Sequence, residues 1–390
     1  MLYDLEVFSF EGLRAAGLAG RPLREAQAWR RMEVSTAPED TLPVNFDNVR
    51  VFSPVSAQIR EEIAAVWTSV PRSGPSTLDL EGWCLAGRNG FLFNPESGIA
   101  IIGQGLGGSP DYVRWHTESA LGAVWSSDGR RLRFEGPGPV RAGALEEWSC
   151  LLGMPGQDIY GHWLLDAVPR MHLASEFFEA AIGTRAGMLT PFSPPWAREF
   201  FEVMGYPPPR VTTLEENKVY RLVSTLTPSI PKNGYVVHMQ TCRDAWQAFR
   251  AASPRKASGL RGERLYVSRR NWAVQRPIAN EEAVEAALTA RGFLTVHPQS
   301  LSLAEQAELF ARARLIIGQD GSALHNILHA EAGAGLGVIG LPERRNYWHF
   351  AFTEAMGHQV AFMECLPGPG GMTADIAELN LMVDALEAVR

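Results

Sequence analysis

The sequence has few of the features that identify several large classes of protein. Its four cysteines lie far apart and form no CxxC pair: Cys84, Cys150, Cys242 and Cys365. This pattern indicates neither a zinc site nor a disulfide framework. No apolar run approaches the length of a membrane span, and the N-terminus carries early acids where a signal peptide would be basic and then apolar. We therefore expect a cytoplasmic protein, with any membrane contact peripheral and at the inner face.

Several nucleotide-binding and hydrolase motifs are missing as well. The chain contains neither GxGxxG nor GxxxxGK[ST], which argues against a dehydrogenase and a P-loop ATPase. It has no GxSxG elbow, which argues against an α/β hydrolase. The formal net charge of -7 is spread without long runs of either sign. Nucleic acid is therefore not expected as a partner.

The 390 residues, of which 46% are hydrophobic, exceed the usual size of one compact domain. Short apolar pieces separated by Gly, Pro, Asn and Ser predict a β-rich portion over 1–150, with one helix at "SAQIREEIAAVW". Strands and helices alternate afterwards, which predicts parallel sheets with covering helices. We place one α/β lobe at 151–250 and a second at 260–372, with a basic loop between them and a C-terminal helix over 373–390.

The stretch "GQDGSALHNILHA", residues 318–330, follows the branched apolar run "RLIIGQ". The pattern predicts a buried strand, a turn and a short helix, whose free N–H groups would favour an anion. Gly318 and Gly321 would permit a tight turn, and Asp320 or Ser322 would cap the helix. Asn326 falls within the first turns of that helix. The simplest alternative makes Asp320 a cap and nothing more.

Two other stretches carry candidate chemistry. In "GQDIYGHWLLDAVPRM", His162 and Asp166 are four residues apart and would share one face of a helix. They are interpreted either as a base and its orienting group or as local structural contacts. In "YVSRRNW", Arg269 and Arg270 follow a strand, where one arginine could grip phosphate while the other is solvated.

Two further polar residues complete the pattern. Gln306 lies on an amphipathic helix, where a polar residue is usually at the surface. Glu343 comes just after the last strand of the series, where its carboxylate could meet a sugar or ribose hydroxyl. No metal site is predicted, because the His162 and Asp166 spacing supplies only two ligands.

Taken together, "YGHWLLDAVPRM", the run from "ERLYVSRRNW" to "SALHNILHA", and "GLGVIGLPERRNYW" resemble the family 61 glycosyltransferases over roughly residues 155–350. Bacterial members of this type serve capsule and other surface polysaccharide synthesis. The resemblance implies an α/β fold of GT-B type, with two Rossmann-like lobes and a ligand cleft between them. It also implies a nucleoside diphosphate sugar donor and inverting transfer to a hydroxyl of a glycan or lipid-linked acceptor. A divalent cation (Mg²⁺ or Mn²⁺), a peripheral membrane contact and a homo-oligomer stay open.

The resemblance assigns roles residue by residue. Arg269 matches the arginine of the family's SR motif, which implies diphosphate binding. The family's G-x-H-G-A motif falls on Gly318, Asp320, Gly321 and Ser322, with Asp320 in place of the histidine and Ser322 in place of the alanine. Asn326 matches the asparagine that follows. The expected substrate-binding residues are Arg269, Arg270, Gly318, Gly321, Ser322, Asn326, Gln306 and Glu343.

For the catalytic base we favour Asp166 or His162, with Asp320 as the third choice. Inverting transfer needs such a base at the acceptor hydroxyl, and it needs stabilisation of the leaving diphosphate. The competing hypothesis is a non-catalytic protein that binds a nucleotide sugar or glycan within a polysaccharide assembly system. The replacement of the motif histidine by Asp320 is its main support.

Overall fold

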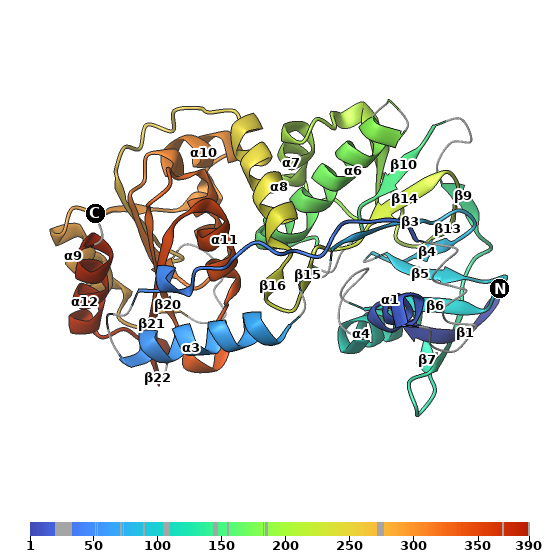
Figure 1. Ribbon diagram of the computed structural model, residues 1–390, viewed down its shortest axis with the longest axis horizontal. Coiled ribbons are helices and arrows are strands. Elements are labelled where there is room, and N and C mark those ends of the chain that lie inside the picture. Colours follow the sequence, from blue (N-terminus) through green and yellow to red (C-terminus); the bar gives the residue numbers. More distant parts are fainter. Residues whose placement is uncertain are drawn as a thin grey trace. The chain divides into compact units, whose positions relative to one another are not determined.

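The computed structural model describes residues 1–19, 33–50, 52, 54–70, 72, 74–88, 90–103, 110–142, 147–153, 156–181, 183, 186–270, 277–368 and 370–388 (Figure 1). The fold is mixed α/β and divides into two compact units. Unit 1 comprises Met1–Asp40 and Arg72–Gly234, and unit 2 comprises Thr41–Pro71 and Tyr235–Arg390. The domain limits and the two-lobe arrangement expected from the sequence stay predictions.

The first sheet of unit 1 is built mainly from the β-rich portion that the sequence predicts. Its order is β7-β8-β1-β6-β5-β4-β13-β9. In β8, Leu132 and Phe134 are buried, while the charged residues that alternate with them are exposed. This is the two-residue period of a half-buried strand. The strands are β1 (Leu2–Ser9), β4 (Cys84–Ala86), β5 (Phe91–Asn94), β6 (Ile99–Ile102), β7 (Val124–Trp125), β8 (Arg131–Glu135), β9 (Val140–Ala142) and β13 (Val219–Leu222). The helices α1 (Phe10–Ala19) and α4 (Pro110–Leu121) belong to the same unit.

The second sheet of unit 1 has the order β12-β11-β10-β14-β3-β2, and its first four strands run parallel. The strands are β2 (Glu33–Thr36), β3 (Ser76–Asp79), β10 (Ser149–Leu151), β11 (Gly187–Thr190), β12 (Val211–Thr213) and β14 (Thr225–Pro228). The chain leaves β10 toward β11 on one side and later returns to β14 on the other side. In an open α/β sheet, the carboxyl edge at such a reversal of strand order is where ligands bind.

A buried arginine holds this edge together. Arg170 is 1% exposed, and its guanidinium donates to the carbonyl oxygens of Pro228 (2.7 Å), Gly153 (2.5 Å) and Leu151 (3.2 Å) and to Thr227 Oγ1 (2.6 Å). Burial lowers the pKa of Arg170 to about 10, so the side chain is still charged at neutral pH. One side chain therefore satisfies polar groups at the ends of both β10 and β14.

Unit 2 contains one parallel sheet with the order β18-β17-β19-β20-β21. The predicted strands and helices of this region are confirmed. They are β17 (Arg264–Val267), α9 (Glu281–Ala290), β18 (Leu294–Val296), α10 (Leu303–Ala311), β19 (Leu315–Gln319), the 3₁₀ helix η5 (Ser322–His329), β20 (Gly335–Gly340) and α12 (Ile376–Glu387). The structure adds α11 (Trp348–Met356) and β21 (Gln359–Glu364), which the sequence did not predict. Numbered along the chain, the order is 2-1-3-4-5. The strand order therefore reverses between β17 and β19, which marks that carboxyl edge as a ligand site.

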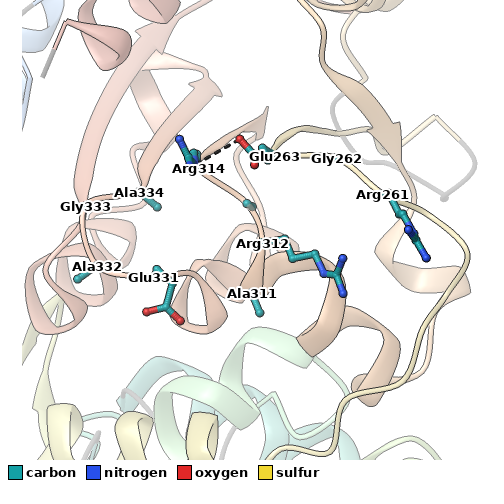
Figure 2. A pocket seen from close by; sticks show the side chains of 11 residues that line it. Arg261, Gly262, Glu263, Ala311, Arg312, Arg314, Glu331, Ala332, Gly333 and Ala334 are labelled. Carbon is teal, nitrogen blue, oxygen red and sulfur yellow. Dashed lines mark ion pairs between the residues drawn. The ribbon is translucent and has the colours of Figure 1, made fainter. Parts of the chain in front are cut away.

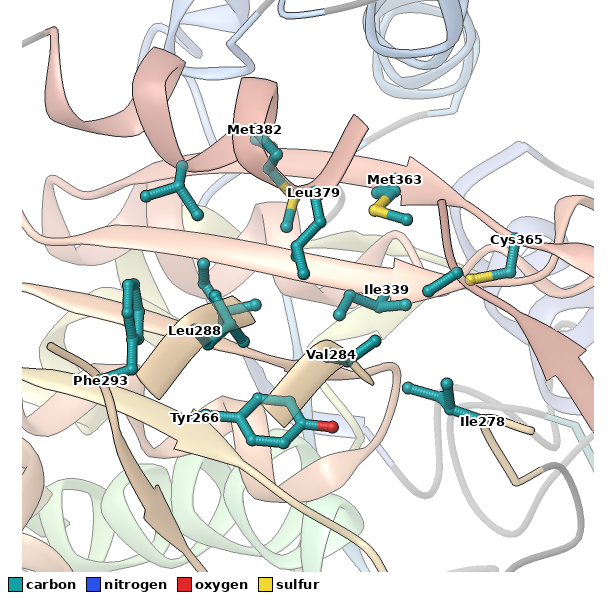
Figure 3. Packing of buried hydrophobic residues seen from close by; sticks show 14 of the residues in the cluster. Tyr266, Ile278, Val284, Leu288, Phe293, Ile339, Met363, Cys365, Leu379 and Met382 are labelled. Carbon is teal, nitrogen blue, oxygen red and sulfur yellow. The ribbon is translucent and has the colours of Figure 1, made fainter. Parts of the chain in front are cut away.

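Helices α9 and α12 cover one face of this sheet and enclose its apolar core (Figure 3). Leu315 and Ile317 of β19 point into this core together, two residues apart. Glycines on β20 let α12 approach closely, because a Cβ atom added at Gly337 would lie 2.8 Å from Cε of Met382. The run "GLGVIG" is therefore shaped by helix packing as well as by burial.

An N-terminal segment also belongs to unit 2, which the sequence did not predict. Helix α3 (Pro54–Ser69) contacts β21. The carboxylate of Glu354 accepts hydrogen bonds from the backbone N–H of Asn45 (2.9 Å) and the side chain of Asn48 (2.7 Å). Arg345 pairs with Glu62 of α3 and with a glutamate of β21. Among the described residues, none of the helices is both long and apolar enough to cross a membrane.

Asn280 and Ser302 each stand just before a helical pattern, so the sequence predicts that they cap α9 and α10, and the two predictions have different outcomes. Ser302 caps α10 in a capping box with Glu305, as the sequence indicates. The prediction that the side chain of Asn280 caps α9 is wrong, because that amide bonds the backbone N–H and carbonyl of Ala374 instead. The basic loop predicted from residue 250 begins later, since α8 (Met239–Ala252) extends to Ala252.

Replacing Arg170 with methionine should destabilise unit 1 strongly. The change removes four hydrogen bonds from a charged donor, each contributing about 1.5–3 kcal/mol. It leaves the carbonyl oxygen of Gly153 without its donor, whereas the carbonyl oxygens of Leu151 and Pro228 keep the hydroxyl of Thr227 at 2.8 and 3.4 Å. We expect a loss of at least about 3 kcal/mol, or a fall in Tm of roughly 6–12 °C, measured by scanning calorimetry. The matched control is Arg198→Met, since the side chain of Arg198 is 69% exposed and pairs with Glu202 at the surface of α7 (Ala197–Val203). That variant should change stability by less than about 0.5 kcal/mol. Equal effects in the two variants would contradict the role given to Arg170.

Candidate functional site

The first group of candidate residues follows β10, on a helix interrupted by one π-helical turn. This turn covers Trp163–Ala167, between α5 (Tyr160–His162) and α6 (Val168–Ala181). Trp163 is fully buried, and its indole N–H donates to the carbonyl oxygen of Gln157 at 2.8 Å. Its ring packs against Phe201 with centroids 5.2 Å apart. Single π turns occur frequently at functional sites, and here the tryptophan fixes the turn in place.

His162 and Asp166 come together in this turn, as their spacing predicts. His162 Nδ1 lies 2.7 Å from Asp166 Oδ2, and Nζ of Lys232 lies 2.6 Å from Asp166 Oδ1. Burial alone would raise the pKa of the Asp166 carboxyl, but the ammonium of Lys232 and the hydrogen bond from His162 outweigh it and hold the pKa at about 2. Asp166 is therefore a carboxylate at neutral pH.

The charge state of Asp166 determines which proton His162 carries. An ionised carboxylate can only accept, so the hydrogen of their bond belongs to Nδ1 of the imidazole. In a neutral ring the lone pair then stays on Nε2, where it can take up a proton. The side chain of His162 is 21% exposed, whereas that of Asp166 is 1% exposed. The geometry matches a base, His162, with its orienting group, Asp166, and it disfavours Asp166 itself as the base.

Lys232 is a member of this group that sequence reasoning missed. It lies in β15 (Lys232–Asn233), shortly after β14, and its side chain is only 8% exposed. No local pattern links it to Asp166, because the two residues are brought together by the pairing of β10 and β14.

The second group lies in unit 2, where β17 and β19 end. Nη1 of Arg269 donates to the backbone carbonyl of Asp320 at 3.0 Å. A Cβ atom added at Gly321 would lie 2.8 Å from that same Nη1. The predicted tight turn is present, since β19 ends at Gln319 and η5 begins at Ser322. It does not depend on a left-handed glycine, because Gly321 has an extended φ of 170° and Gly318 is not left-handed either. Both glycines instead allow close approach: Gly321 to Arg269, and Gly318 to Val267, whose carbonyl oxygen would lie 2.8 Å from an added Cβ.

Asp320 has a different partner from the one predicted. It does not cap η5, since Gly321 occupies the N-cap position and Ser322 is the first residue of the helix. Oδ1 of Asp320 instead lies 2.9 Å from Nε2 of His349, a fully buried residue of α11. Sequence reasoning missed His349, which is separated from Asp320 by the whole of η5 and β20.

The remaining candidates separate into solvated and buried residues. Arg270 is the solvated member of the arginine pair, with its side chain 43% exposed and 3.2 Å from Glu285. The interpretation of Gln306 as a surface residue is wrong, because it is buried and its Oε1 accepts a 2.8 Å hydrogen bond from Asn326. That bond links α10 to η5. Glu343 is exposed in the short helix Pro342–Arg344.

Two hollows formed by described residues of unit 2 lie away from most of these candidates, and Arg270 alone among them lines one. One of about 770 Å³ lies where β17, β19 and β20 begin, at the edge opposite Arg269 and Asp320. Figure 2 shows its arginines, among them Arg314, which pairs with Glu263 at 3.3 Å. Another of about 540 Å³ lies by the start of α9 and is lined by Arg270 and residues 277–283.

Metal ligands and thiols are two further classes of candidate group in this chain. Within the described ranges, no three His, Cys, Asp or Glu side chains lie close enough together to hold a metal ion. All four cysteines are buried thiols. Burial raises the pKa of the Cys150 thiol to about 12, so that thiol is unreactive at neutral pH.

Comparison with known proteins bears on both groups of residues. No curated protein matches the chain. One protein family does match, over residues 160–337, which is somewhat less than half of the chain. This range contains His162, Asp166, Arg269 and Asp320 but ends before Glu343 and His349. The matching family is Glycosyltransferase 61, and the match points to a glycosyltransferase.

Proposed function

We propose that this protein is an inverting glycosyltransferase. It moves a sugar from a nucleoside diphosphate sugar to a hydroxyl of a glycan or lipid-linked acceptor, in the cytoplasmic synthesis of a surface polysaccharide. The observation that carries the proposal is the buried Lys232–Asp166 pair with His162 hydrogen-bonded to it. The proposal includes the GT-B arrangement implied by the resemblance, in which both groups of residues act on one substrate.

The acceptor side of the reaction depends on His162. As the acceptor oxygen attacks the anomeric carbon, Nε2 of His162 takes the proton of the hydroxyl. Asp166 keeps the ring in the required tautomer and stabilises the imidazolium that forms. Attack from the face opposite the diphosphate inverts the anomeric centre.

The donor side depends on Arg269. The bond between the anomeric carbon and the diphosphate oxygen breaks, and negative charge develops on the leaving group. The guanidinium of Arg269 and the N–H groups at the start of η5 are placed to stabilise that charge. The described donor-side residues do not form a ligand set for Mg²⁺ or Mn²⁺, so no step is drawn through a divalent cation.

The alternative is a non-catalytic protein that binds a nucleotide sugar or glycan. Such a protein would need the donor-side residues but not an imidazole with a fixed tautomer. Burying Asp166 and Lys232 together carries a desolvation cost, which binding alone would not require. The His162 group therefore favours the enzyme.

The base assignment predicts a large and specific loss of turnover. His162→Ala should lower kcat by about 10²–10⁴-fold, because a positioned general base typically contributes that much. The Kd of the donor should be unchanged. The measurement is the release of nucleoside diphosphate from the nucleotide sugar in the presence of acceptor, together with calorimetric donor binding.

The matched control for this variant is His172→Ala. His172 lies on α6 in the same unit, is 18% exposed and faces Glu176, four residues on, at 3.3 Å. It should keep near-normal kcat. If His162→Ala also kept normal kcat with unchanged donor binding, the assignment of the base would be wrong.

The diphosphate site predicts different behaviour for the two neighbouring arginines. Arg269→Ala should weaken the binding of nucleoside diphosphates by about 10–100-fold, since charge-assisted hydrogen bonds are lost. Arg270→Ala should change it little, because Arg270 is solvated and paired with Glu285. Thermal shift with UDP, GDP, ADP and CDP measures both, since a ligand of the folded state raises Tm. Equal loss in the two variants would count against the site.

Gly321→Ala tests the same site without removing a charge. The new methyl group would meet Nη1 of Arg269 at 2.8 Å, so the guanidinium must move. The extended φ of 170° accepts alanine without backbone strain. We expect weaker nucleotide binding at an unchanged Tm of the ligand-free protein. Unchanged binding would mean that this position of Arg269 is not the binding position.

A further inference from the structure

The two oxygens of the Asp320 carboxylate have different environments. Oδ1 is held at 2.9 Å by Nε2 of His349, a side chain with no exposed surface. No hydrogen bond within the described part of the chain engages Oδ2, and the side chain keeps 9% of its surface exposed. His349 thus fixes the carboxylate from behind while one oxygen stays available to a ligand.

An aromatic cluster lies at the start of α11, the helix that carries His349. The ring of Tyr235 is 36% exposed and packs on Tyr347 and Trp348, with centroids 5.5 and 5.3 Å apart. Trp348 directly precedes His349 in α11. Burial raises the pKa of Tyr235, and the negative charge of the Asp320 carboxylate raises it further. The phenol of Tyr235 is therefore within electrostatic reach of Asp320. Aromatic faces beside a few fixed polar groups are typical of small-molecule sites.

The position of Asp320 also limits what its carboxylate can bind. Its own backbone carbonyl accepts from Arg269, so a phosphate at that guanidinium lies next to Asp320. A carboxylate repels phosphate but accepts hydrogen bonds from hydroxyl groups. The group that fits is therefore a hydroxyl on a ring attached to the phosphate.

We propose that Oδ2 of Asp320 accepts a hydrogen bond from a hydroxyl of a sugar ring joined to the diphosphate, and that His349 is the positioning residue that aims this oxygen. The ring is either the ribose of the nucleotide or the sugar to be transferred. This inference rests on the proposed function, since it places the ring by the diphosphate at Arg269. It gives Asp320 the task of recognising the donor.

The test compares ligands with and without the hydroxyl. Calorimetry measures the affinity of UDP, GDP, ADP and CDP, of their 2′-deoxy and 3′-deoxy counterparts, and of UDP-glucose, GDP-mannose, ADP-glucose and CDP-glucose. The wild type is compared with Asp320→Ala. We expect a loss of about 10–100-fold for the ligands that carry the hydroxyl, as for a hydrogen bond to a charged group. Ligands that lack it should lose little.

The ligand series separates the two sources of the hydroxyl. If the preference for a ribonucleotide over one of its deoxy counterparts collapses in Asp320→Ala, the hydroxyl belongs to the ribose. If the preference for the nucleotide sugar over the nucleoside diphosphate collapses instead, it belongs to the transferred sugar. If both preferences survive, the proposal is overturned while the proposed function stands. If the wild type binds none of these ligands, both fail.

Conservative variants separate positioning from folding. The amide of His349→Gln can donate from the place of Nε2, so this variant should keep the ligand preference, whereas His349→Leu should lose it. If His349 had a merely structural role, its replacement would lower Tm and weaken the binding of all ligands alike, and His349→Gln would not restore the ligand preference. Asp320→Asn keeps the side-chain shape and serves if the alanine variant does not fold; a smaller loss of the same preference is expected. Equal behaviour of His349→Gln and His349→Leu would overturn the role of His349.

Discussion

The ion pair between Lys232 and Asp166 is the interaction on which the first group of residues depends. Both side chains are almost fully enclosed, so each ion has lost most of its hydration, and the attraction between two charges 2.6 Å apart offsets that loss. Arg170, which follows Asp166 by four residues, adds a second buried positive charge to this region. The paired carboxylate in turn fixes the proton on Nδ1 of His162. A charge held in the interior of unit 1 thus sets the chemistry of a side chain at its surface.

The same topological rule places both groups of residues. The strand order reverses between the parallel strands β10 and β14 in unit 1 and between the parallel strands β17 and β19 in unit 2. The first reversal carries an imidazole backed by a buried acid. The second carries an arginine and an acid backed by a buried imidazole. One arrangement is suited to moving a proton, and the other to holding a phosphate and a hydroxyl.

Features that depend on periodic or closely spaced residues could be predicted from the sequence. Most strands and helices of unit 2 follow from apolar periodicity, and the contact between His162 and Asp166 follows from their spacing of four. Lys232 and His349 could not be found in this way, because chain folding rather than sequence proximity brings them to their partners. Gly318 and Gly321 show a second limit. A glycine pattern indicates that a side chain is excluded, but not whether a turn or a neighbouring residue excludes it.

The placement of Thr41–Pro71 has a consequence for how the protein folds. The chain passes from one unit to the other three times, after Asp40, Pro71 and Gly234. Helix α3 leaves the ribosome early, but β21, against which it packs, is made near the end of synthesis. Contacts so distant in sequence form slowly, and an apolar helix face waiting for its partner is open to wrong associations. Neither unit can therefore be completed from one continuous piece of chain, and unit 2 closes only when almost the whole polypeptide has been synthesised.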